Sequence, residues 1–222
     1  MNVNIWGPAL WDILHGFSSI VNENNFIHFN NIVYELNYLL PCIHCQKSYI
    51  EYYNEPFQPP TYFSSKIYFM KYVYDLHNKV NEKLDTQKGR QSINPDFNVI
   101  LKKLAINNAL EEPFQINNIW KFLFTLALKY DTESNQEEYL KHFIRFISSC
   151  SNFLNGFLDN KISNNLDKLK NLIYKNANVL LMGKKSVLFI LICKTTNLNE
   201  NDLYNNFVKN VPAGSCGTYT CI

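Results

Sequence analysis

The sequence contains few of the residues that interrupt regular structure. Among its 222 residues there are only 7 glycines and 8 prolines, and no stretch sustains the apolar–polar alternation of a strand that ends in a hairpin turn. Apolar positions instead recur every three or four residues, as at Phe26, Phe29, Val33, Leu36 and Leu40. The sequence therefore predicts an all-α protein.

Several functional classes are also disfavoured by what is missing. The net charge is only +2 and no dense basic tract occurs, so we expect no nucleic-acid partner. The longest apolar run, residues 186–193, is far too short to cross a bilayer, so we expect no membrane partner. The first residues, MNVNIWGPALW, have neither the pattern of a secretory signal nor that of a transit peptide, which predicts a cytoplasmic protein.

The periodic segments predict four or five helices in residues 1–110. The first starts near Gly7-Pro8 and runs to about Asn22, because proline is favoured in a first helical turn. The second ends near residues 40–41, and the third carries the segment CIHCQKSYIEYYNE. Ser64 is the expected N-cap of a long fourth helix that ends near Leu84. A polar loop over 85–97 and a short helix over about 95–110 complete this half.

Residues 111–222 are predicted to form a second helical domain. It contains four or five helices, among them the segments IWKFLFTLALKY, EEYLKHFIRFISSCSNFL and VLLMGKKSVLFILIC. The first of these is strongly apolar, and we expect it to lie in the core. The second half carries no motif to which chemistry can be assigned.

The chain has six cysteines, which is many for a protein expected in the reducing cytosol. Cys150 and Cys193 stand alone in apolar surroundings and are expected to be buried, inert thiols. The other four form two close pairs, Cys42/Cys45 and Cys216/Cys221.

The first cysteine pair is compatible with three interpretations. Pro41 ends one helix and Cys42 opens the next, so at least one sulfur gains the positive end of a helix dipole, which favours a reactive thiolate. His44 lies between the two cysteines and could act as a proton donor. Alternatively, all four paired cysteines could bind zinc, or the pair could simply belong to the core. A thioredoxin-like site is disfavoured because no strand precedes Cys42.

A polar group interrupts the apolar face of the fourth helix, in the segment HNKVN. His77 and Asn81 share one face, and Asn78 is a neighbour of Asn81. Such groups need hydrogen-bond partners, either within the protein, in solvent at a helix edge, or in a bound molecule. Three of them within one and a half turns favour a polar ligand.

Three segments together resemble a known family. WGPALWDILH, LLPCIHCQKSY and LHNKVNEKL, in this order within the first 84 residues, are similar to the motifs of the Erv/ALR family of FAD-linked sulfhydryl oxidases. The resemblance covers roughly residues 5–110. The asparagine-rich composition is similar to that of members encoded by large cytoplasmic DNA viruses, which would place the protein in the host cytoplasm or the virion.

The resemblance implies a helical bundle that holds FAD beside the cysteine pair. Cys45 would be the cysteine next to the flavin and would provide the thiolate, while Cys42 would exchange disulfides with a substrate dithiol. Electrons would then pass from a protein dithiol through the pair and FAD to O2, which gives hydrogen peroxide. The resemblance implies these flavin-binding residues: Gly7, Pro8, Trp11, His15, His77, Asn78, Val80, Asn81 and Lys83. Lys83 is expected to reach the phosphates, and Pro8 takes a position that is often basic.

Other features of the family remain open in this chain. Cys216 and Cys221 match a mobile shuttle disulfide, but a structural disulfide is an equal alternative. A homodimer is expected from the resemblance, and no metal is expected in the oxidase. The alternative to an oxidase is a non-enzymatic helical interaction module, stapled by zinc or disulfides through the four paired cysteines. A third interpretation is a flavin-binding scaffold without turnover.

Overall fold

A computed structural model describes residues 3–54, 59–106, 114–155, 161–182 and 186–196. All regular structure in these ranges is helical, which confirms the predicted all-α class. The helices are α1 (Val3–Ile20), α2 (Phe26–Leu39), α3 (Ile43–Asn54), α4 (Lys66–Gln87), α5 (Phe97–Ile106), α6 (Phe114–Tyr130), α7 (Gln136–Leu154), α8 (Lys161–Lys175), α9 (Ala177–Leu181) and α10 (Val187–Thr196). Over the same ranges, no helix is both long and apolar enough to span a bilayer.

Several predicted helix boundaries were wrong; the N-cap of α4, for example, is Ser65 rather than Ser64. Helix α1 begins at Val3, so Pro8 lies inside it rather than in its first turn. Proline lacks the amide hydrogen of an interior helical bond, but Pro8 is exposed, and the rest of α1 packs well enough to tolerate one missing bond. The segment VLLMGKKSVLFILIC is not one helix: α9 ends at Leu181, and Ser186 has a left-handed φ of 65° immediately before α10.

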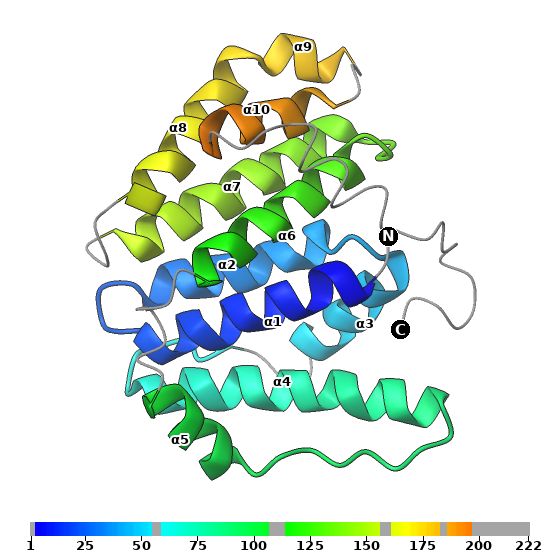
Figure 1. The fold of residues 1–222 in the computed structure, drawn as a ribbon, viewed down its shortest axis with the longest axis vertical. Helices are drawn as coiled ribbons and strands as arrows, with labels where there is room; N and C mark the ends of the chain where they lie inside the picture. Colours follow the sequence, from blue (N-terminus) through cyan, green and yellow to red (C-terminus); the bar gives the residue numbers. More distant parts are fainter. Residues whose placement is uncertain (1–2, 55–58, 107–113, 156–160, 183–185, 197–222) are drawn as a thin grey trace.

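Helices α3, α4, α6 and α7 are arranged around α1 and α2 (Figure 1). Helix α1 packs against α4 and α6, and α2 packs against α3 and α7. Helices α8 and α10 pack on each other and extend this arrangement away from α4 and α5, which lie at the opposite end of the view in Figure 1. The cysteine-bearing helix α3 therefore lies beside the first two helices.

The two halves of the chain share a hydrophobic core. Phe17 of α1 stacks on Phe153 of α7 with 4.7 Å between ring centroids, and Trp6 contacts Phe122 of α6 at 6.4 Å. The apolar helix α6 is buried through Phe122, as expected of a core segment. Burial of such aromatic side chains is the main stabilising contribution available to helices of this kind. The boundary at residue 110 stays a prediction.

Candidate functional site

Cys42 occupies the residue directly before α3, where a helix leaves its first amides without intrahelical partners. The Cys45 backbone N–H donates to the Cys42 sulfur, with 3.3 Å between nitrogen and Sγ. The Gln46 N–H donates to the Cys42 carbonyl at 2.8 Å. The pair was predicted to open a helix, and the structure confirms this position of Cys42.

The two thiols have opposite electrostatic environments. A hydrogen bond from the Cys45 side chain, helped by backbone amides at the helix start, lowers the pKa of Cys42 to about 6 although burial opposes this. The same hydrogen bond, together with burial, raises the pKa of Cys45. In the dithiol described here, the thiolate is therefore favoured at Cys42, whereas the family resemblance assigns it to Cys45.

The two sulfurs also differ in accessibility. Cys42 is 0% exposed and belongs to the core, whereas Cys45 is partly exposed. In this conformation a substrate thiol has no direct approach to Cys42, the cysteine expected to exchange with substrate. That exchange role stays a prediction and requires the segments over Cys42 to move.

A cavity of about 430 Å³ lies between α1, α3 and α4, and Cys45 lines it. Its α1 wall includes Trp6, Gly7, Leu10 and Trp11. This volume falls within the range of about 300–1,000 Å³ that is typical of small-molecule sites. The redox-capable pair and the cavity therefore share one side chain.

Five of the nine residues expected at a flavin line this cavity. They are Gly7, Trp11, Val80, Asn81 and Lys83. Pro8 is exposed on α1, and Asn78 is half-buried on α4. His15 and His77 do not line the cavity. Both rings instead contact Trp11, which does line it.

Trp11, His15 and His77 connect α1 to α4. The ring of His77 stacks on Trp11 with 4.0 Å between centroids and 8° between planes. His15 Nε2 lies 3.0 Å from His77 Nδ1, so one of the two nitrogens donates to the other. Burial lowers the pKa of His77 to about 4, because the charged form is poorly solvated there. A neutral His77 ring thus packs against the Trp11 indole and holds it in place at the cavity.

The comparison with known proteins gives one match. Residues 8–101 match the Erv1 / Alr family. Proteins of that family are in general FAD-linked thiol oxidases. No curated protein and no solved structure matches the chain.

The cavity, which lies mostly in the segment that matches this family, suits a flavin. Trp6 and Trp11 offer flat apolar faces, and Asn81 and Lys83 provide donors. The indole N–H of Trp6, in a side chain that is 5% exposed, has no hydrogen-bond partner in the part of the chain that the structure describes. A buried donor without a partner is uncommon, and a carbonyl of a bound ring would satisfy it.

Sequence reasoning missed part of this cavity. Trp6, Leu10 and Leu14 line it, and their spacing of four residues on α1 was a signal that could have found them. On α3, Lys47 and Ser48 also line it. No local pattern distinguishes these two from an ordinary solvated helix face.

The remaining cysteines divide into two groups. Cys150 and Cys193 are buried, as predicted, and burial raises the pKa of Cys150. Cys216 and Cys221 lie outside the described residues. Within the described ranges, no three His, Cys, Asp or Glu side chains are placed to hold a metal ion, and a four-cysteine zinc site including the C-terminal pair remains a separate hypothesis.

Proposed function

We propose that this chain is an FAD-linked thiol oxidase that makes disulfide bonds in substrate proteins, with O2 as the final electron acceptor and hydrogen peroxide as product. The observation that carries the proposal is the position of Cys45. It belongs to a thiol pair at a helix start and also lines a cavity with flavin-compatible walls.

The disulfide exchange step needs only the substrate dithiol and the Cys42–Cys45 disulfide. A substrate dithiol attacks the Cys42–Cys45 disulfide, and a mixed disulfide forms. The second substrate thiol then displaces the enzyme sulfur, so the substrate gains a disulfide and the pair gains two electrons and two protons. FAD, when bound, would accept the two electrons of the reduced pair, and O2 would take them from the flavin to give hydrogen peroxide.

The protein's contribution is binding and electrostatics. The helix start stabilises a Cys42 thiolate, which favours the reduced form of the pair and makes its disulfide a better oxidant. The α1 wall, through Trp6 and Trp11, would hold the ring system. The hydrogen bond with Cys42 and burial raise the pKa of Cys45, and the charge of Lys83 opposes this rise on the cavity side.

The first experiment combines the visible spectrum of the purified protein with oxygen uptake after addition of dithiothreitol. The proposal predicts flavin absorption bands, rapid oxygen consumption and peroxide formation. A yellow protein without turnover would contradict the oxidase and favour the scaffold interpretation. A colourless protein that releases zinc on denaturation would favour the stapled interaction module.

Two expectations are retained as proposals. The protein acts in the cytoplasm, and it forms a homodimer. Size-exclusion chromatography with light scattering tests the dimer directly, because a monomeric mass at micromolar concentration would contradict it.

A further inference from the structure

Lys129 is a buried lysine of α6, outside the segment that matches the family. The residue is 8% exposed, and its ammonium donates to the Leu40 carbonyl at 2.9 Å and toward the Tyr38 carbonyl at 3.4 Å. Both carbonyls lie at the C-terminal end of α2, where helical acceptors lack intrahelical donors. Lysine at this end also interacts favourably with the helix dipole.

Lys129 places a positive charge against the chain that leads into Cys42. Leu40, to which Lys129 donates, is separated from Cys42 only by Pro41. Burial lowers the pKa of Lys129, and the opposing effects that raise it come from Glu133 and from the Cys42 thiolate. A negative charge on Cys42 therefore raises the pKa of Lys129.

The charged and titratable groups near the two side chains are few. The pKa of Cys42 is influenced by Cys45 and His44 of α3, and the charge of Cys42 acts on Lys129 of α6. Lys129 itself pairs with Glu133 at 3.3 Å and lies 5.2 Å from the centre of the Tyr139 ring.

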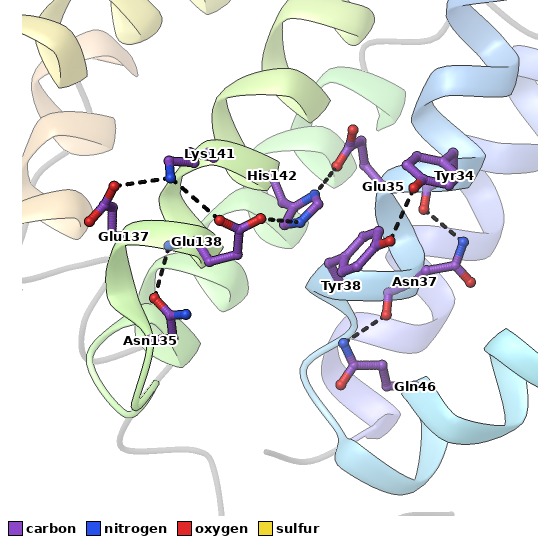
Figure 2. A network of polar contacts seen from close by, with 10 residues as sticks. All are labelled: Tyr34, Glu35, Asn37, Tyr38, Gln46, Asn135, Glu137, Glu138, Lys141 and His142. Carbon is purple, nitrogen blue, oxygen red and sulfur yellow. Dashed lines mark hydrogen bonds and ion pairs between the residues drawn. The ribbon is translucent and has the colours of Figure 1, made fainter.

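Helix α7 holds the same part of α2 from another side. Figure 2 shows His142 reaching Glu35, with 2.6 Å between Nδ1 and Oε2. The His142 ring also stacks on Tyr38 with 3.7 Å between centroids. On the α3 side, the Gln46 side-chain amide donates to the Asn37 carbonyl at 2.7 Å. The segment that leads into Cys42 is therefore fixed from three helices.

We propose that Lys129 is a positioning residue for the redox pair: it fixes the chain leading into Cys42 and stabilises the Cys42 thiolate. The second half of the chain thereby helps to set how oxidising the pair is. The redox role assumed for Cys42 and Cys45 rests on the proposed function. The effect of Lys129 on the Cys42 thiol does not, because it can be measured without flavin or turnover.

The experiment compares Lys129→Met with Lys129→Arg and with Lys121→Met, which removes an exposed lysine from the same helix. Thiolate absorbance in the ultraviolet is titrated for each protein and for its Cys42→Ser counterpart, and the difference gives the pKa of Cys42. The equilibrium of the pair with dithiothreitol is measured in parallel.

In Lys129→Met, the pKa of Cys42 is expected to rise by about one unit, and the equilibrium should shift about tenfold toward the disulfide, or ~30 mV for a two-electron couple. Lys129→Arg should retain most of the wild-type behaviour, and Lys121→Met all of it. The proposal is overturned if Lys129→Met shifts neither quantity more than Lys121→Met does.

A second variant keeps the test decisive if Lys129→Met does not fold. Glu133→Gln removes the other anion paired with Lys129 and leaves the lysine in place. The pKa of Cys42 should then fall, which is the opposite sign. An unchanged or raised pKa in Glu133→Gln would contradict the proposal. An absence of flavin or turnover would instead count against the oxidase, since the thiol titration is independent of both.

Discussion

The ammonium group of Lys83, on α4, donates to the hydroxyl of Ser48, on α3. Ser48 lies one helical turn after Cys45, and the charge of Lys83 lowers the pKa of Cys45 against the hydrogen bond and the burial that raise it. The family resemblance assigns Lys83 to the cofactor phosphates. That assignment stays a prediction; in the structure Lys83 lines the cavity and its charge partly offsets the rise in the pKa of Cys45.

Lys83→Met is therefore expected to slow turnover more than it removes cofactor. Loss of the cation should raise the pKa of Cys45, and a one-unit rise reduces the thiolate fraction about tenfold. We expect kcat with dithiothreitol to fall about tenfold while the flavin content per protein stays near that of the wild type. Lys79→Met, on the same helix, is the matched control. A parallel loss of flavin and activity would instead support the phosphate role.

Gly7→Ala should separate folding from cofactor binding. Gly7 lies inside α1, where alanine is more favourable by up to about 1 kcal/mol. A Cβ at this position would meet nothing closer than Val3 Cγ1 at 3.5 Å, an ordinary contact. Because Gly7 lines the cavity, the added methyl group should weaken flavin binding. Urea unfolding of the flavin-free variant should show equal or higher stability, and its flavin content should be lower. Lower stability with full flavin content would contradict this account.

Sequence periodicity was sufficient for the helical class, and the family motifs indicated the region of the candidate site. The apolar faces of α2 and α7 have the spacing that amphipathic packing requires, and Pro41 correctly indicated the break before Cys42. The three family motifs lie on α1, α3 and α4, and these are the helices that line the cavity. These are properties of short segments, which local patterns report well.

The features that sequence reasoning missed depend on distant contacts. In the sequence, Lys129 is an ordinary basic residue in the last turn of an amphipathic helix. Its contact with the Leu40 carbonyl is seen only in the folded structure. Trp6 reads as core, and its unpartnered N–H becomes visible only with its neighbours in place. The burial of Cys42 likewise depends on packing among helices far apart in the sequence.

Cys45→Ser should abolish turnover without removing the cofactor. The pair cannot form a disulfide with a serine, and a hydroxyl does not replace a thiolate in exchange. Oxygen uptake with dithiothreitol should fall to background while the visible flavin bands persist. Cys150→Ala, a buried thiol far from this chemistry, should retain wild-type turnover. Turnover that survives in Cys45→Ser would exclude the proposed role of Cys45.

Stability of the flavin-free protein should depend on pH through His77. In the folded protein the pKa of His77 is lowered from 6.5 to about 4, so between these values the unfolded chain takes up a proton that the folded chain does not. Stability should therefore fall as the pH drops from 6.5 to 4, by up to about 3 kcal/mol. His77→Phe retains a ring that can stack on Trp11 but does not titrate. Urea unfolding across this range should show a smaller pH dependence in the variant, and equal slopes would contradict the assignment.

The buried contact between His142 and Glu35 should be a strong link between α7 and α2. Both side chains are 6% exposed, so removing the imidazole leaves the Glu35 carboxylate buried without this partner. His142→Ala is expected to lower the free energy of unfolding by about 3 kcal/mol. Lys141→Ala, at the next residue, breaks only exposed pairs with Glu137 and Glu138 and should change stability by less than about 1 kcal/mol.

A double variant distinguishes the lost charge partner from lost packing. If the buried carboxylate is the cause, adding Glu35→Leu to His142→Ala should recover part of the lost stability, because no uncompensated charge remains. If lost stacking of His142 on Tyr38 is the cause, the second substitution should give no recovery. Chemical denaturation of the four proteins in this cycle measures the difference. Recovery would show that the lost stability comes from a buried Glu35 side chain left without its partner His142.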